Sequence, residues 1–479
     1  MSSRYEHIVL GVGGVGAAAA YWLAKRGGSV LALEQYRLGH DRGASEDHSR
    51  IIRHSYHTTE YTSLTRFAYD HVRDLEHETG LELLRITGGL NLAPNDSAGQ
   101  AEIGSYARAL AEQGHACEVL DGTELRARWP QWQVGSEVIG LYQAGSGILD
   151  IRRVNSAHIS RARALGVRFL DRTPARKIVP FADHVEVHTD SEVFEAGTLT
   201  ICAGSWTEAM TASLGIEVPL TLTQEQVSYF AAPDLRAFAP DRFPVWIFHD
   251  HDATFYGFPV YGEAAVKAAR DMSGRVVTQQ TRRYEPDPEQ TAEVTRFLAR
   301  YLPGAVGPEL LSKTCVYDLT ADRNFILDTI PGQPRIGLFV GAGHAAKFVG
   351  LIGHILADLA VDGRTGYPIE AFSIGRPAVR DPDYPSDFRF SRAAQALPGP
   401  SDPALQTGAR HDHGSVRGVP ADPARQLLHR SRHLRAGEAR HLRETVDVRV
   451  PGAGRADAGP VRARHRRERE RHRRPRPRR

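Results

Sequence analysis

The stretch HIVLGVGGVGAAAAYWLAKRGGSVLALEQ at residues 7–35 predicts a strand, a tight glycine turn, a helix and a second strand that ends on an acid. Gly11 allows the turn, Gly13 allows the backbone to approach a phosphate, and Gly16 allows the helix to pack closely on the strand. Amide groups at the start of the helix would face a pyrophosphate, and Glu34 would bind a ribose hydroxyl. Because the motif lies between an apolar strand and an alanine-rich helix, it predicts a dinucleotide site rather than a plain packing turn.

The next stretch, YRLGHDRGASEDHSRIIRH at residues 36–54, indicates which dinucleotide is bound. Nicotinamide dehydrogenases usually continue into another crossover helix, whereas this loop is rich in Gly, His and Ser and carries Arg50 and Arg53. It resembles the monomeric sarcosine oxidase and N-methyltryptophan oxidase family of FAD-dependent amine oxidases. The other stretches that share the resemblance are GLYQAGSGIL (140–149), TICAGSWT (200–207), FYGFPVYGEAAVKAARD (255–271), TCVYDLTADRNFILD (314–328) and GAGHAAKFVG (341–350). Together they extend the resemblance over residues 5–378.

Hydrophobic spacing and turn residues predict the remaining elements. Helices are expected at 59–80, 98–114, 151–166 and 347–361, and from Asp287, with Pro288 behind it, to Pro303. Strands are expected at 81–94 with a Gly-Gly turn, at 167–170, 183–189, 197–204 and 336–343, and repeatedly between 221 and 262. With the resemblance, this predicts an α/β fold with a Rossmann-like FAD-binding domain and a second, mostly antiparallel sheet domain for the substrate. The predicted FAD-binding domain comprises residues 1–80, 149–220 and 321–380, and the substrate domain comprises residues 81–148 and 221–320.

Three cysteines, Cys117, Cys202 and Cys315, in 479 residues argue against a disulfide framework and for a reducing compartment. Apart from residues 8–24, where glycines interrupt the apolar run, no segment approaches the ~18 apolar residues of a membrane helix. We therefore expect a soluble, cytoplasmic protein with no membrane partner, and the resemblance implies that it is a monomer.

Net charge divides the chain into two parts. Residues 391–479 hold 22 Arg, no Lys and nine acids, a net charge of +13, which leaves 38 basic and 48 acidic residues in residues 1–390. The basic part lacks aromatic residues, Ile and Met, so it predicts a disordered Arg-rich tail. The alternatives are GC-rich sequence translated outside its natural frame, or, least favoured, a segment that binds nucleic acid through counterion release.

The resemblance assigns the cofactor contacts. A cysteine in an apolar strand is by itself often a small buried hydrophobe, but Cys315 matches the residue that the family links to the 8α-methyl carbon of the flavin. The residues expected at FAD are Gly11, Gly13, Gly16, Glu34, Ser49, Arg50, Ala203, Gly204, Cys315, Gly343 and Lys347. No metal ligand is assigned.

Lysine is rare in this chain, which makes its positions informative. Residues 1–390 contain five lysines and 33 arginines. Lys267 resembles the family's lysine near the reactive nitrogen of the flavin, where a fixed cation would stabilise charge that develops on dioxygen. The resemblance also gives catalytic roles to Arg50, over the flavin ring, and to His344, just before the last helix. Ordinary surface roles for Lys267 and Arg50 are the alternatives.

A substrate carboxylate is implied by a second pair of cations. Arg53 and Lys347 match the pair that binds it in the family, and two buried cations without an anion would be costly. Tyr256 and Tyr317 match the aromatic walls of the pocket, although an aromatic residue in a strand can also be plain core. Asp271 departs from the family's histidine, and its charge would repel a substrate carboxylate. A second departure, Ala345 and Ala346 in place of Gly and Phe, opens space beside Lys347.

These observations predict an FAD-dependent oxidase of secondary amino acids such as sarcosine or an N-methyl amino acid. Oxidative demethylation would consume dioxygen and yield the amino acid, formaldehyde and hydrogen peroxide. The alternatives are an FAD oxidase of a cyclic imino acid or another amine, a nicotinamide-dependent dehydrogenase, and a weakened flavoprotein whose basic tail is a binding module.

Overall fold

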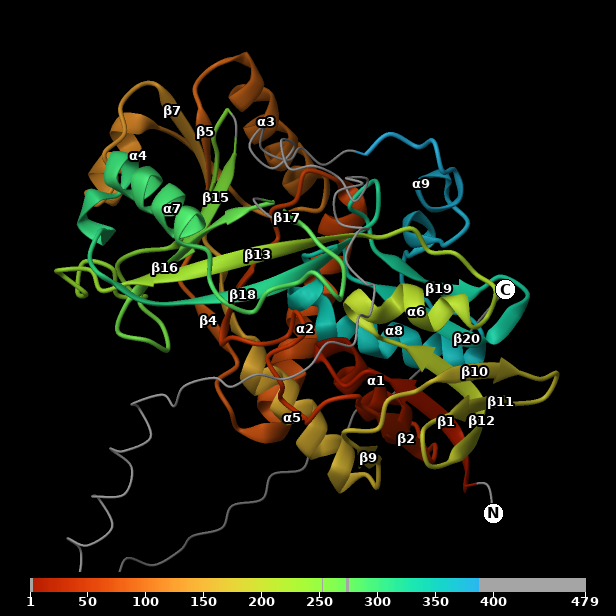
Figure 1. Cartoon of the computed structure of the whole chain (residues 1–479). Coiled ribbons are helices and arrows are strands. Elements are labelled where there is room, and N and C mark those ends of the chain that lie inside the picture. Colours follow the sequence, from red (N-terminus) through yellow and green to blue (C-terminus); the bar gives the residue numbers. More distant parts are fainter. Residues whose placement is uncertain (1–2, 252, 273–274, 387–479) are drawn as a thin grey trace, which may run out of the picture. The chain divides into compact units, whose positions relative to one another are not determined.

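The computed structural model describes residues 3–251, 253–272 and 275–386 (Figure 1). The predicted disordered tail, residues 391–479, lies outside the described residues. The described helices and strands form two large sheets, a small sheet and the helices packed on them.

The first sheet has eight strands in the order β10-β11-β12-β1-β2-β9, with β20 on β12 and β19 on β20. Its strands are β1 (Ser3–Leu10), β2 (Val30–Leu33), β9 (Arg168–Leu170), β10 (Lys177–Pro180), β11 (Val185–His188), β12 (Val193–Ile201), β19 (Ile326–Ile330) and β20 (Gln333–Val340). The central strand β1 runs parallel to both β2 and β12. A parallel strand in this position is covered on both faces, which explains its continuous apolar sequence.

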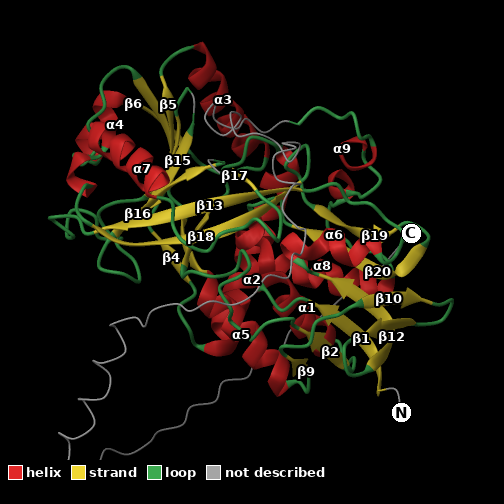
Figure 2. Cartoon of the chain, viewed as in Figure 1, coloured by secondary structure: helices red, strands yellow, loops and turns green. Residues whose placement is uncertain are grey.

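Alternate residues of β1 pack into different cores, as the pleat of a strand requires. Ile8 and Leu10 pack in the cluster that contains β10, β11 and β12. Val9 packs on the opposite side against α1 (Gly14–Lys25). Helices α5 (Ile151–Ala164) and α8 (Val349–Asp362) lie beside α1 (Figure 2), so three helices cover this face.

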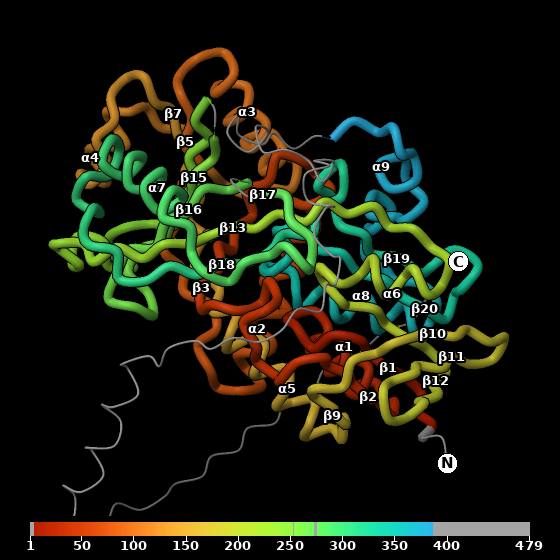
Figure 3. Tube along the Cα trace, in the orientation of Figure 1, coloured from red at the N-terminus to blue at the C-terminus, as the bar shows by residue number. Residues whose placement is uncertain are grey.

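The second sheet has nine strands in the order β17-β13-β16-β15-β14-β5-β7-β6, with β18 on β13. Its strands are β5 (Gly89–Pro94), β6 (Glu118–Asp121), β7 (Val138–Gln143), β13 (Thr221–Phe230), β14 (Val245–His249), β15 (Thr254–Phe258), β16 (Val266–Asp271), β17 (Arg275–Val276) and β18 (Glu309–Leu319). The long strands β13 and β18 run side by side (Figure 3) and are antiparallel. Only β5 and β14 pair in parallel among the described strands of this sheet, so the predicted mostly antiparallel sheet is confirmed.

Helices α3 (Ser97–Glu112), α4 (Gly122–Arg128) and α7 (Pro288–Tyr301) accompany the second sheet. Asp287 caps α7 by accepting a hydrogen bond from the Glu289 amide, as the sequence predicts. Phe297, on the buried face of α7, stacks on Phe255 with the ring centroids 4.2 Å apart. The apolar face of α7 thereby closes the core on that side of the sheet.

A small third sheet joins β3 (Ser49–Ile52), β8 (Gly147–Asp150) and β4 (Leu84–Ile86). The predicted strand region 81–94 therefore divides between two sheets, because β4 pairs with β8 whereas β5 pairs with β7 and β14. The adjacent glycines 88 and 89 mark this change of sheet rather than a hairpin between β4 and β5. Gly88 has a φ of 74°, a conformation that glycine adopts without strain.

The predicted helices are confirmed at α3, α5, α7 and α2 (Thr59–Thr79). The last helix begins two residues later than predicted, at Val349, because Ala345–Phe348 forms a short 3₁₀ helix. All strands of the first sheet come from the segments predicted for FAD, and all strands of the second come from the segments predicted for the substrate. The division into two domains at those boundaries stays a prediction. Within the described residues, no helix is both long and apolar enough to cross a membrane.

Candidate functional site

One cavity of about 1370 Å³ is bordered by residues of all three sheets. It extends from the glycine turn after β1, past β3, β16 and β18, to the 3₁₀ helix before α8. Every residue that the sequence analysis assigns to cofactor, substrate or catalysis lines this cavity. The fold therefore brings together segments more than 300 residues apart, and the roles of the individual residues stay predictions.

The glycine turn leaves no room for side chains. A Cβ on Gly11 would lie 2.4 Å from the carbonyl oxygen of Cys202, and Gly11 has a φ of 86°. A Cβ on Gly16 would lie 1.8 Å from the carbonyl oxygen of Gly11. The Ser45 hydroxyl accepts a hydrogen bond of 2.8 Å from the Gly14 amide at the start of α1. Close contact of backbone with backbone thus shapes a cradle at a helix N-terminus, the kind of place where proteins hold phosphates.

Glu34 ends the strand beside this cradle. Its carboxylate accepts hydrogen bonds from the Val12 amide at 2.9 Å and from the Tyr36 amide at 3.0 Å. Burial opposes the charged form, but these bonds and the neighbouring His40 hold the pKa of Glu34 below its usual value. Glu34 is therefore a fixed, buried and ionised acceptor, which suits hydrogen-bond donors such as ribose hydroxyls.

Arg53 and Lys347 approach each other at Tyr56. The ammonium of Lys347 donates to the Tyr56 hydroxyl at 2.8 Å and to the His344 carbonyl at 2.9 Å. The guanidinium of Arg53 lies 5.0 Å from the centre of the Tyr56 ring and donates to Asn91 at 2.7 Å. Burial, and then the positive charge of Arg53, lower the pKa of Lys347 well below its usual value.

Asp271 has a partner that the sequence analysis does not anticipate. Both terminal nitrogens of Arg323 lie 3.3 Å from one Asp271 oxygen, and the Tyr317 hydroxyl donates to the other at 3.2 Å. Arg323 offsets part of the Asp271 charge, and the expectation that Asp271 repels a substrate carboxylate stays a prediction. His344 bonds to the Arg323 carbonyl at 2.9 Å, and burial and neighbouring cations lower the pKa of His344 well below its usual value.

Cys315 lies on β18, opposite Glu225 of β13. It is a free cysteine that lines the cavity, and burial raises the pKa of its thiol to about 11. Arg50, on β3, donates to the backbone carbonyls of Ser49, Ala44 and Glu46. Cys315 and Arg50 therefore both lie on strands that border the cavity, β18 and β3.

Lys267 lies on β16 and is 3% exposed. Its ammonium donates to the Asp47 carboxylate at 2.5 Å and to the carbonyl and hydroxyl oxygens of Ser49, both at 3.0 Å. The buried ion pair with Asp47 thus holds the positive charge of Lys267 at one position in the cavity wall.

Several cavity residues that contact the candidates were not singled out from the sequence, among them Asp47, Tyr56, Lys313 and Arg323. Two of these residues could have been selected from the sequence. Lys313 is one of the few lysines, and Asp47 lies in the loop that decides the cofactor. The pairing of Arg323 with Asp271 joins residues 52 positions apart, which no local pattern predicts.

Comparisons with known proteins agree with this geometry. Residues 6–359 match the family described as FAD dependent oxidoreductase. The monomeric sarcosine oxidase of Streptomyces avermitilis is 32% identical over 387 residues, covering 79% of this chain and 99% of that protein. The N-methyl-L-tryptophan oxidase of Escherichia coli is 30% identical over 379 residues, covering 78% of this chain and 99% of that protein.

Solved structures with a similar fold include two amino acid oxidases. The structure of NikD, described as an unusual amino acid oxidase essential for nikkomycin biosynthesis, has a TM-score of 0.70 and 26% identity, covering 78% of this chain and 98% of that chain. The glycine oxidase of Geobacillus kaustophilus, at 17% identity and a TM-score of 0.68 over 78% of this chain and 99% of that chain, shares the fold.

The residues present fit FAD. The cradle at Gly11 and Gly16 excludes any side chain, the ionised Glu34 stands beside it, and the cavity continues from there to β16 and β18. The family match removes the nicotinamide-dependent alternative. The chain belongs to the family of FAD-dependent oxidoreductases, with FAD as its cofactor.

Proposed function

We propose that this enzyme is an amine oxidase that acts on a secondary amino acid, such as sarcosine or another N-methyl amino acid. The observation that carries the proposal is the pair formed by Arg53 and Lys347. In the part of the chain that the structure describes, the hydrogen-bond partners of both cations are neutral: Asn91 for Arg53, and Tyr56 and the His344 carbonyl for Lys347. The relatives named for sarcosine and N-methyl-L-tryptophan support the same substrate class.

Two cations that share a buried wall are costly unless an anion joins them. The lowered pKa of Lys347 reflects that cost, because burial opposes the charge on its ammonium most strongly and the positive charge of Arg53 opposes it next. A carboxylate bound between Arg53 and Lys347 would restore the charge of the ammonium and accept charge-assisted hydrogen bonds. The site therefore favours substrates that carry a carboxylate next to the amine.

The chain's own residues orient the substrate and exclude water. Arg53 and Lys347 would hold the carboxylate, Tyr256 and Tyr317 would flank the amine, and Lys267 would supply a fixed positive charge for the reaction with dioxygen. When bound, FAD accepts the two electrons that leave the amine. An N-methyl amino acid, water and dioxygen would give the amino acid, formaldehyde and hydrogen peroxide, so atoms and electrons balance.

We also propose that Cys315 is linked to FAD through a thioether. The cavity position of Cys315 supports this, and the raised pKa means that the thiol must lose its proton as the bond forms. The link would join Sγ to the 8α carbon with loss of one hydrogen from each, and dioxygen would take both as hydrogen peroxide. Arg50, Lys267 and Arg282 each lower the pKa of this thiol against burial, so the surrounding charge favours the thiolate.

A second candidate substrate is a cyclic imino acid. Asp271 supports it, because its carboxylate lines the cavity and, although paired with Arg323, can accept a hydrogen bond from a positively charged ring nitrogen. The likeness to NikD, named as an amino acid oxidase, is compatible with it. We further infer a monomer that works in the cytoplasm, supported by the relatives described as monomeric and by three free cysteines.

The experiment is a peroxide-coupled screen of N-methyl amino acids, cyclic imino acids and matched amines that lack the carboxylate. We expect turnover of the carboxylate-bearing substrates, with N-methyl amino acids the best. Lys347→Met should raise the KM of amino-acid substrates far more than that of the amines, since losing one partner of a buried charge pair costs about 2–5 kcal/mol. Equal losses on both kinds of substrate would refute the carboxylate site.

A further inference from the structure

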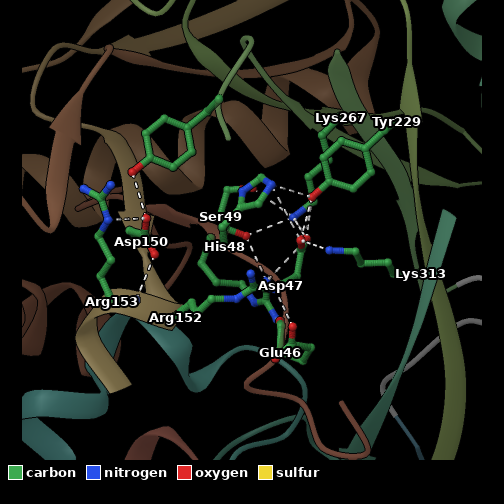
Figure 4. Close-up of polar contacts among 12 residues, drawn as sticks. Glu46, Asp47, His48, Ser49, Asp150, Arg152, Arg153, Tyr229, Lys267 and Lys313 are labelled. Atoms are coloured by element: carbon green, nitrogen blue, oxygen red, sulfur yellow. Dashed lines mark hydrogen bonds and ion pairs between the residues drawn. The ribbon is translucent and has the colours of Figure 1, made fainter. Parts of the chain in front are cut away.

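Asp47 lies at the centre of a buried group of charges that we call the Asp47 cluster: Asp47, Ser49, Tyr229, Lys267 and Lys313 (Figure 4). One carboxylate oxygen accepts from Lys267 at 2.5 Å, and the other accepts from Lys313 at 3.1 Å. The Tyr229 hydroxyl lies 2.7 Å from both oxygens. Three donors from β13, β16 and β18 thus meet at a single acid from the loop before β3.

Asp47 has an unusual backbone conformation that fixes the position of its carboxylate. Asp47 has a φ of 74°, in the left-handed region that only glycine adopts freely and that Asp and Asn tolerate better than other residues. Its side chain is 7% exposed. A strained backbone persists where the surroundings determine it, and here those surroundings are the Asp47 cluster.

We propose that Asp47 is a positioning residue that fixes the ammonium of Lys267 at the cavity wall and keeps it charged. The bonds to Asp47 and Ser49 take up all three protons of the Lys267 ammonium, so it has one orientation. Three cations, Arg50, Lys267 and Lys313, face one carboxylate in this small volume. Without the acid, mutual repulsion and burial would both act against the charge on Lys267.

The charge balance gives the direction of the effect. Burial lowers the pKa of Lys267 to about 8, the Asp47 carboxylate opposes this, and Arg50 adds to it. Burial also opposes the charge on Asp47, but Lys267, Arg50 and the Tyr229 hydroxyl hold the Asp47 pKa far below its usual value. The other titratable groups that face the cluster are His48, from the same loop as Asp47, and Cys315, from β18.

Loss of the carboxylate should therefore lower the pKa of Lys267 further. Asp47→Asn is a close replacement, because Asn tolerates the same backbone conformation and keeps one acceptor oxygen. The Lys267 ammonium should therefore lose its proton at a lower pH in the variant than in wild type. This readout follows one group and is independent of turnover, so its failure is distinguishable from failure of the proposed substrate class.

The test is ¹³C NMR of the flavin-loaded full chain labelled at lysine Cε, which is practicable because the whole chain contains five lysines. The signal that Lys267→Met removes belongs to Lys267. We expect its titration midpoint in Asp47→Asn to fall by about 1–3 pH units, the range for loss of a nearby opposite charge. Asp47→Glu should recover part of the shift, because it restores the carboxylate.

Asp150→Asn is the matched control. Asp150 is a buried carboxylate nearby that also accepts from a tyrosine, Tyr261 at 3.0 Å, but its cationic neighbour is Arg153 rather than a lysine (Figure 4). This control should leave the Lys267 midpoint close to wild type. An unchanged midpoint in Asp47→Asn, or an equal shift in both variants, would overturn the proposal.

A second variant keeps the proposal testable if Asp47→Asn does not fold. Lys313 is partly exposed at 31% and shares the carboxylate with Lys267. Lys313→Met removes a like charge and one of the cations that share the carboxylate with Lys267, so the midpoint should rise, opposite in sign to Asp47→Asn. A fall or no change in Lys313→Met would count against Asp47 as the residue that governs Lys267.

Discussion

Arg323 combines an unusual backbone conformation with a position at the cavity. Its φ is 53°, rare for a residue with a long side chain, and its guanidinium faces Asp271. Asp271 in turn raises the pKa of Lys347, which indicates that the carboxylate lies within electrostatic reach of that ammonium. Arg323 therefore decides whether Asp271 is neutralised or competes with substrate for Lys347.

Replacing Arg323 with Met should weaken the binding of substrate carboxylates. We expect the KM for amino-acid substrates to rise about tenfold, within the range of ~0.5–3 kcal/mol for pairs of side chains that touch. Adding Asp271→Asn should recover most of the loss, because the uncompensated charge is then gone. Steady-state kinetics of the two single variants and the double variant measure this, and additive losses would contradict the coupling.

The proposed thioether at Cys315 has a direct test. Acid-precipitated, denatured wild type should stay yellow, because a covalent flavin remains with the protein. Cys315→Ala should release its colour to the supernatant, and Cys202→Ala, a change at the other free cysteine in the cavity, should not. Colour in the wild-type supernatant would refute the link.

Residue types and their local spacing predict which residues line the cavity, but they do not predict the pairs that those residues form. Lys267 and Cys315 could be selected because lysine and cysteine are rare and each lies in a distinctive stretch. The partner of Lys267 lies 220 positions away, and Asp271, the last residue of β16, meets Arg323 only because the segment between β18 and β19 folds back to it. Charge compensation of this kind depends on tertiary contacts, so the partner of a departure such as Asp271 cannot be predicted from its own stretch of sequence.

At the scale of elements, capping residues and apolar spacing predict the helices well. The α7 helix begins at the predicted proline because Asp287 accepts the bond from an early amide. The strand pairing of residues 81–94 is harder to predict, since an apolar run with two glycines suits a hairpin as well as a change of sheet. Which strands β4 and β5 pair with depends on β8, β7 and β14, which lie far away in the sequence.

The packing of α1 on α8 gives a prediction at this scale. A Cβ on Gly353 of α8 would lie 2.5 Å from the Cβ of Ala18 of α1, so the helices approach too closely for a larger residue. Gly353→Ala should destabilise the protein by about 1–3 kcal/mol through overpacking. Differential scanning calorimetry of the flavin-loaded protein measures this as a lower Tm.

Gly366→Ala is the control for that measurement. A Cβ on Gly366 would have no heavy atom of the described residues within 4 Å, apart from its own neighbours in the chain. The φ of Gly366 lies outside the positive range in which an alanine would be strained. This variant should match wild type or be slightly more stable, because alanine restricts the unfolded chain. Equal losses of stability at Gly353 and Gly366 would show that the α1–α8 contact is not the cause.

At the scale of the whole chain, charge separates residues 1–390, with 38 basic and 48 acidic residues, from residues 391–479, with a net charge of +13. The family match ends at residue 359, and among the described residues all those that line the cavity precede residue 350. The catalytic part of the chain is therefore acidic, and the overall basic pI of about 8.7 comes from the other part.

Deleting residues 391–479 should leave flavin content and turnover unchanged, because the cavity and its supporting sheets are built from residues before them. The same deletion should move the isoelectric point from basic to acidic. If the least favoured alternative holds and the Arg-rich segment binds nucleic acid, the deletion should also abolish salt-sensitive retention on a nucleic-acid column. Flavin absorbance, peroxide-coupled turnover and isoelectric focusing of the two proteins measure these effects. Loss of flavin or of folding in the shortened chain would show that the basic segment contributes to the fold, whereas retention that persists after the deletion would place nucleic-acid binding on the catalytic part.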